Sequence, residues 1–126
     1  MSSVAAFDDF AWHDATLLGI RVDRRNPGSM DVVAVDLEWP DGRCETMKFT
    51  DCYRLDIGMN FGVLGVETIL GARISGNDAD LISLRSRWEP LGVKLDDCRC
   101  YEITTNSTAS KIRVFAKAFD VHPLEK

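Results

Sequence analysis

The sequence has few of the features that mark membrane and secreted proteins. Its 126 residues contain no run close to the roughly 18 apolar residues that a membrane-spanning helix needs. The first ten residues hold two aspartates and no lysine or arginine, so they lack the positive start and apolar stretch of a signal peptide. We therefore expect a cytoplasmic protein without a membrane partner, whose cysteines stay reduced.

Motifs of known enzyme chemistry are also missing. The chain has only two histidines, and it has no glycine-rich phosphate loop, nucleophile elbow or His-Glu-x-x-His motif. The acidic pairs Asp8–Asp9 and Asp96–Asp97 are neighbours in sequence, whereas glycosidase chemistry needs two carboxyls that converge from separate positions. The sequence does not exclude an enzyme, but it indicates no catalytic residues and no cofactor.

The four cysteines raise the question of a metal site. Cys98 and Cys100 would place two thiols on one face of a strand, and with Cys52 or His13 they could ligate zinc. However, their spacing is not that of a zinc ribbon, and no second pair completes the set. We predict unbridged, metal-free thiols that are buried as small apolar groups. A small-ligand or metal pocket near His13 and the cysteines is kept as the alternative function.

Composition and charge favour a folded acidic protein. With 45% apolar and 28% charged residues, the chain can build a core, and its length suits a single domain over 1–126. The net charge of −5 comes from residues 1–60, which hold eleven acidic and six basic residues, while 61–126 hold nine of each. This balance disfavours nucleic acid as a partner. It is compatible with a basic partner protein, where complementary charge mainly raises the association rate.

Hydrophobic alternation with a period of two dominates the chain and predicts β-strands. The segments with this pattern are 16–24, 31–39, 43–61, 98–105 and 111–121. The first two form a predicted hairpin, and so do the last two. Segment 43–61 fits one bent strand or two strands. Segment 66–74 also fits a helical period, but its β-branched residues favour a strand.

One helix is predicted near 77–88, with Asn77 as the N-cap and Pro90 ending it. The predicted fold is therefore mainly β, or α+β: an antiparallel sheet or sandwich of about six or seven strands with one short helix. The apolar positions of the strands predict the core. They are Leu18, Ile20, Val22, Val33, Val35, Leu37, Leu55, Ile57, Val114 and Ala116.

The segment before the first strand is the candidate partner-binding site. Its candidate residues are Asp8, Asp9, Trp12, His13 and Asp14. An aromatic side chain among acidic residues is typical of an interface anchor. The alternative is structural: the tryptophan would lie in the core, and the histidine would hydrogen-bond the backbone at the strand entry.

The run from Phe10 to Ala15 (Phe-Ala-Trp-His-Asp-Ala) resembles the opening of several small bacterial families. These include immunity proteins of polymorphic toxin systems and related families with no assigned role. The segment from Tyr101 to Ser110, a strand followed by a Thr-Asn-Ser turn, is similar to the same families. The resemblance implies a small β-rich protein that binds another protein, such as a toxin, and has no catalysis of its own.

Overall fold

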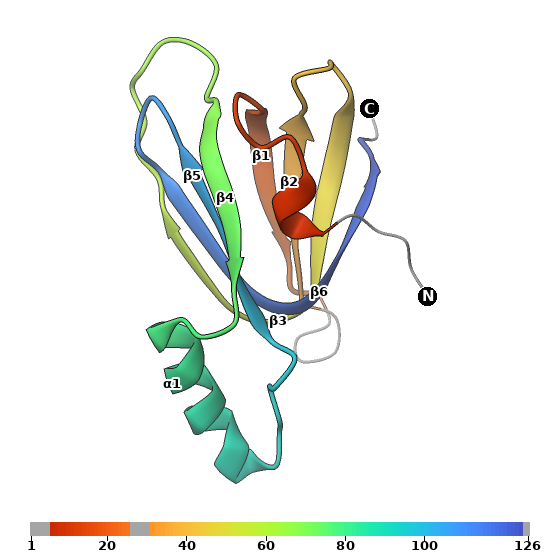
Figure 1. Ribbon diagram of the computed structural model, residues 1–126, viewed down its shortest axis with the longest axis vertical. Helices are drawn as coiled ribbons and strands as arrows, with labels where there is room; N and C mark the ends of the chain where they lie inside the picture. The colour runs from red at the N-terminus through yellow and green to blue at the C-terminus, as the bar shows by residue number, and fades with distance from the viewer. Residues whose placement is uncertain (1–5, 26–30, 125–126) are drawn as a thin grey trace.

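The computed structural model describes residues 6–25 and 31–124, and over these ranges the chain forms one six-stranded antiparallel sheet with a short α-helix (Figure 1). The elements are η1 (Phe7–Asp9), β1 (Thr16–Asp23), β2 (Val32–Glu38), β3 (Cys44–Gly58), β4 (Ile69–Ser75), α1 (Ala79–Trp88), η2 (Glu89–Leu91), β5 (Arg99–Thr105) and β6 (Lys111–Pro123). This confirms the predicted mainly β fold. No helix in the described ranges has the length and apolar character that a membrane crossing requires.

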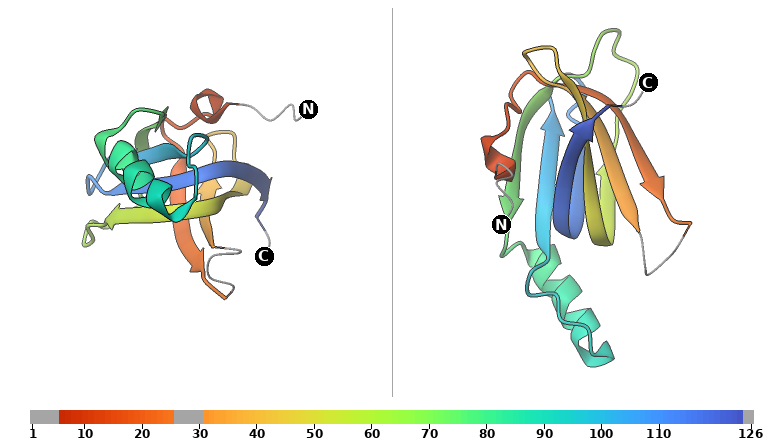
Figure 2. Two further views of the ribbon diagram at one scale, coloured as in Figure 1. Left: turned by 90° about the horizontal axis from the view of Figure 1, so that it is seen from below. Right: turned by 90° about the vertical axis from the view of Figure 1, so that its right-hand side faces the viewer.

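The sheet folds over into two facing layers, because its two longest strands bend (Figures 1 and 2). The strand order is β1-β2-β3-β6-β5-β4. β2 pairs only with the first half of β3, and β5 pairs only with the first half of β6. The register of β3 against β6 shifts between Cys52 and Arg54, just after Asp51, whose φ is 54°. The segment 43–61 is thus one bent strand that ends at Gly58.

The two ends of the sheet meet at one corner. Thr16 of β1 and Thr68 form an isolated bridge, and the Leu17 N–H donates to the Glu67 carbonyl at 2.8 Å. The Ile69 N–H donates in turn to the Ala15 carbonyl at 2.7 Å. Residues 69–75 are therefore a strand, as their β-branched residues favour.

The main core lies between the two layers and is rich in aromatic side chains. Its buried residues are Phe7, Trp12, Ala15, Val33, Val35, Leu37, Trp39, Met47, Phe49, Ile69, Tyr101, Ile103, Ile112, Val114 and Ala116. Five of the predicted core residues are among them. Ile20 and Leu55 are partly buried and pack against this cluster.

Three predicted core residues are wrong. Leu18, Val22 and Ile57 are 47%, 50% and 40% exposed. A bulge between Leu17 and Gly19 shifts the alternation of β1, so that Leu17 packs against the core in place of Leu18. Val22 and Ile57 each lie one residue from the end of their strands, where less of the sheet covers them.

This correction changes an expected stability effect. Leu37→Ala should lower the free energy of unfolding by about 2–5 kcal/mol, the usual cost of truncating a buried leucine. Ile57→Ala should lower it by about 1 kcal/mol or less, because much of that side chain is already in water. Urea unfolding of both variants measures the two losses. Equal losses would contradict the assignment of Ile57 to the surface.

α1 packs on the side of β5 and β6 that faces away from the main core. Leu81 and Leu84 contact a second buried cluster that includes Cys98, Cys100 and Phe115. The predicted N-cap was wrong by one residue: the Asp78 carboxylate accepts hydrogen bonds from the N–H groups of Asp80 and Leu81, at 2.9 and 3.3 Å. The carboxylate thus accepts hydrogen bonds from backbone N–H groups that have no partner within the helix.

Candidate functional site

The segment predicted to bind a partner lies along the free edge of β4. One Asp8 carboxylate oxygen accepts a hydrogen bond from the Ile74 N–H at 3.2 Å. The Asp14 N–H donates to the Ile69 carbonyl at 3.0 Å, and His13 Nδ1 lies 3.2 Å from the Leu70 carbonyl oxygen. The segment therefore covers an edge strand that would otherwise be open to pairing with another chain.

Trp12 lies in the core, in agreement with its structural interpretation. Its side chain is only 4% exposed, and its indole N–H donates to the Phe7 carbonyl at 2.6 Å. The ring contacts Phe7 and Trp39, with centroids 4.8 and 5.2 Å away. It offers a partner no exposed anchor surface.

The polar residues around Trp12 remain on the surface. Asp8, Asp9, His13 and Asp14 are exposed, and His13 Nε2 lies 3.6 Å from an Asp14 carboxylate oxygen. The backbone of Asp14 has a φ of 68°, in the left-handed region that aspartate tolerates better than most residues. His13 thus contacts backbone near the strand entry, and the acidic groups are still accessible to a basic partner.

The cysteines do not join His13 in a site. All four are unbridged, and in the described ranges no group of three or more histidine, cysteine or acidic side chains is placed to hold a metal ion. Cys98 and Cys100 are buried under α1, as predicted for small apolar groups. Burial raises the pKa of Cys52 and of Cys100 to about 11 in each case, which keeps both thiols protonated at neutral pH.

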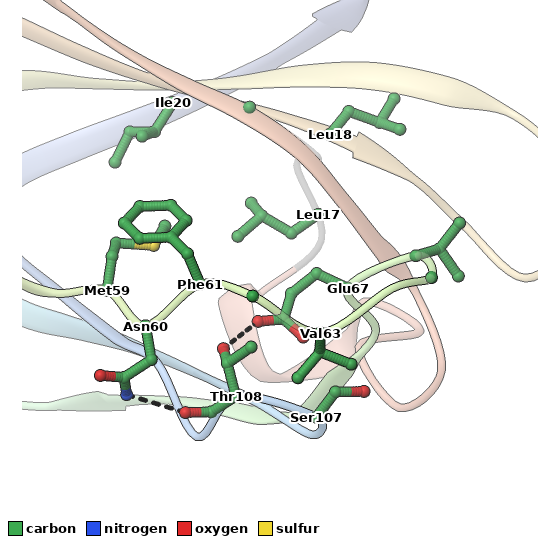
Figure 3. A pocket seen from close by; sticks show the side chains of 14 residues that line it. Leu17, Leu18, Ile20, Met59, Asn60, Phe61, Val63, Glu67, Ser107 and Thr108 are labelled. Atoms are coloured by element: carbon green, nitrogen blue, oxygen red, sulfur yellow. Dashed lines mark hydrogen bonds between the residues drawn. The ribbon is translucent and has the colours of Figure 1, made fainter.

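The most distinctive surface is one that the sequence analysis missed. A hollow of about 420 Å³ lies between β1 and the segment after β3 (Figure 3). We call it the apolar groove. It is lined by Leu17, Leu18, Gly19, Ile20, Met59, Asn60, Phe61, Gly62, Val63, Gly65, Val66, Glu67, Ser107 and Thr108. In Figure 3 the side chains of Leu17, Ile20, Met59 and Phe61 point toward one another.

Beside the groove, the loop 61–66 carries four apolar side chains into solvent. Phe61 is 86% exposed, Val63 53%, Leu64 100% and Val66 69%. Leaving a phenylalanine or leucine in water forgoes about 1.5–3 kcal/mol of burial free energy for each side chain. A contiguous exposed apolar patch of this kind marks an interaction site more often than a patch of scattered residues does.

Two glycines give the loop its path. Gly62 and Gly65 have φ values of 106° and 135°, in the region that residues with a side chain rarely adopt. A Cβ at either position would meet nothing within 4 Å, so the conformation rather than the packing requires glycine.

The β5–β6 loop ties down the base of loop 61–66. The Asn60 N–H donates to Ser110 Oγ at 2.9 Å, and its side-chain amide donates to the Thr108 carbonyl at 2.8 Å. Thr108 Oγ1 donates to the Glu67 carboxylate (Figure 3). The polar groups of the groove are thus used to fix the loop, and they leave its apolar tip exposed.

The groove is also nearly free of charge. The segments 16–20, 59–68 and 106–110 hold one ionisable side chain, Glu67, in a chain that is 28% charged. This neutrality is the signal in the sequence that could have pointed to the site. Residues 57–66 are ten consecutive uncharged positions with three glycines, whereas the alternation pattern alone predicts the end of one strand at 61 and the start of another at 66.

No protein-family model matches the chain, and the search of curated proteins gives no significant match.

Proposed function

We propose that this protein is a non-catalytic protein-binding module whose partner docks on the apolar groove and loop 61–66. The observation that carries the proposal is the combination of a loop fixed at its base with apolar side chains left in water at its tip. The resemblance to immunity proteins supports the further proposal that the partner is a toxin which this protein neutralises.

The acidic segment can contribute to the same contact. Thr16 pairs with Thr68, and the Asp14 N–H bonds to Ile69, so the segment 8–14 leads directly to the end of the groove. A partner with basic residues beside its docking surface would therefore be attracted toward the groove. Such charges at the rim mainly raise the association rate, while the apolar contacts set the affinity.

A small apolar ligand is the second candidate, because 420 Å³ falls in the usual range of ligand sites. A residue at the tip of loop 61–66 distinguishes protein binding from small-ligand binding. Leu64 is fully exposed and does not line the hollow, so a small ligand would not need it. A docked protein would cover it.

The test starts from a partner recovered by affinity capture with the unmodified protein. Leu64→Ser and Phe61→Ser should each weaken the affinity for that partner by about 30-fold or more. Truncating a central apolar anchor commonly costs at least about 2 kcal/mol of binding free energy. Leu91→Ser is the matched control, because Leu91 is also apolar and 71% exposed but lies on η2. Isothermal titration calorimetry measures each affinity.

The charged rim is tested in the same system. A variant with asparagine at positions 8, 9 and 14 should associate more slowly at low salt and converge with the unmodified protein near 1 M salt, where the Debye length is about 3 Å. Unchanged binding by both Leu64→Ser and Phe61→Ser would refute docking at the groove. If only the asparagine variant bound the partner more weakly, the binding site would be assigned to the acidic segment 8–14 instead.

A further inference from the structure

β1 is an edge strand whose open side forms one wall of the groove. It lies at the end of the sheet order, and among the strands of the described residues it pairs with β2 alone. On its open side, the first residues of β1 contact another segment of the chain. Thr16 forms a bridge with Thr68, and the Leu17 N–H donates a hydrogen bond to the Glu67 carbonyl. Leu18, Gly19 and Ile20 line the groove on the side of β1. Leu18 and Ile20 are labelled on this strand in Figure 3.

From this geometry we infer that the groove takes an extended, uncharged, apolar segment of the partner, which adds to the sheet as a strand beside β1. The inference rests on the proposed function, because it assigns a conformation and a chemistry to the partner at the same site. An edge strand supplies main-chain donors and acceptors to an added strand, and the pockets beside it select alternate side chains.

The floor of the groove determines which side chains fit. Leu17, Ile20 and Met59 pack against the main core and also line the groove, so a side chain that points toward them meets apolar groups. A charged side chain entering there would lose its hydration without gaining a counter-charge. The single carboxylate nearby, Glu67, already accepts the Thr108 hydroxyl and disfavours an acidic segment.

Gly19 supports a close approach of another backbone. Its φ is not positive, and an added Cβ would come no closer than 3.9 Å to the nearest atom, Asp36 Oδ2. Neither its own conformation nor the packing around it therefore requires glycine. A residue without a side chain in an edge strand is typical of a place where another backbone approaches. The adjacent bulge, between Leu17 and Gly19, is also common at sheet edges beside functional sites.

The probe is a library of random twelve-residue peptides displayed on phage and selected on the unmodified protein. A counter-selection uses Leu18→Lys, since a lysine on an edge strand opposes strand addition. We expect enriched peptides to share apolar residues at alternate positions over about four residues, with no charge among them. Four residues is also the length of β1 that lines the groove.

A synthetic copy of an enriched peptide then locates the contact. Bound peptide should slow amide hydrogen exchange in residues 18–20, and Leu18→Lys should weaken binding at least 10-fold. Ile82→Lys is the matched control, because Ile82 is 51% exposed against 47% for Leu18 but lies on α1. It should bind the peptide as the unmodified protein does.

Several outcomes would overturn the inference. These are a library without enrichment, a consensus that is charged or has a helical period, and slowed exchange away from β1. Self-association of the unmodified protein that Leu18→Lys abolishes would assign the edge to a second copy of the chain instead. If the peptides fail while Leu64→Ser still weakens the captured partner, the proposed function stands and strand addition is refuted.

Discussion

Replacing Trp12 with alanine is expected to lower the free energy of unfolding by about 3–5 kcal/mol, the range for truncating a buried tryptophan. The side chain is 4% exposed and contacts Phe7, Phe10 and Trp39. Its removal would leave a cavity in the aromatic part of the core. It would also release the Phe7 carbonyl, which accepts the indole N–H, and so loosen the segment that covers β4.

Two further variants identify the cause of the loss. Trp12→Phe keeps an aromatic ring but removes the N–H donor, so it should cost about 1–3 kcal/mol, the usual penalty for a buried acceptor left without its donor. Leu91→Ala truncates an exposed side chain and should change the stability by less than about 0.5 kcal/mol. Urea unfolding gives all three values. A loss below about 1 kcal/mol for Trp12→Ala would contradict the burial of Trp12 and would again make it a candidate anchor for a partner.

Local sequence patterns were sufficient to predict most of the secondary structure. The alternation of Val33, Val35 and Leu37 depends only on neighbouring residues, and these three side chains are buried as predicted. Pro90 lies just past the end of α1 as predicted, but Glu89 before it keeps helical angles (φ −56°, ψ −47°), so the expectation that Pro90 forces Glu89 out of helical conformation is wrong. Pro90 instead lacks the N–H that the next helical hydrogen bond needs. The observed helix ends at Trp88, within the predicted range.

The features that position the groove could not be predicted from local patterns. The bulge at Leu17–Gly19 and the register shift at Cys52–Arg54 each depend on pairing with a distant strand. They decide which side chains of β1 pack against the core and where the sheet folds over. The groove also depends on hydrogen bonds from Asn60 to the loop 106–110, about 50 residues away along the chain.

The candidate partner-binding segment 8–14 was likewise only partly predictable from local sequence. The segment 8–14 was recognised as unusual, and the structure gives it a defined place along β4. The packing of Trp12, however, includes the ring of Trp39, which lies far along the chain. Aromatic and acidic residues in one segment gave no indication that the two kinds of side chain point in different directions.

Arg113 connects α1 to the sheet through an ionic cluster, and its removal is the second large effect that we expect. Its side chain is 16% exposed and lies 2.6 Å from an Asp78 carboxylate oxygen, 2.7 Å from Asp80, 3.3 Å from Glu102 and 3.7 Å from Asp56. The hydrogen bond with Asp80 raises the pKa of Arg113 further above its ordinary value. Burial alone would raise the pKa of Asp78, but the hydrogen bond from Arg113 brings it below the usual 3.8.

Arg113→Met should therefore lower the free energy of unfolding by about 3–5 kcal/mol at pH 7, because it leaves the carboxylates of Asp78 and Asp80 without their cation. Asp56 and Glu102 keep Arg54 and Arg73 as partners. Methionine keeps much of the apolar stem, which limits the loss of packing against the Phe115 ring. Arg25→Met is the control. Arg25 lies 2.6 Å from Asp23, but its side chain is 86% exposed, and its loss should not change the stability measurably.

The pH dependence tests whether charge causes the loss. In the unmodified protein the lowered pKa of Asp78 stabilises the fold above about pH 4, and this contribution is lost as the pH falls below 3.8 and through the folded-state pKa. In Arg113→Met the Asp78 carboxylate keeps its burial but loses the hydrogen bond that lowers its pKa, so the pKa of Asp78 rises and its protonation reduces the destabilisation. The stability difference between the two proteins should consequently narrow between pH 7 and pH 4.5 in urea unfolding. A difference that stays constant over this range would mean that lost packing around Phe115, rather than unpaired charge, destabilises the variant.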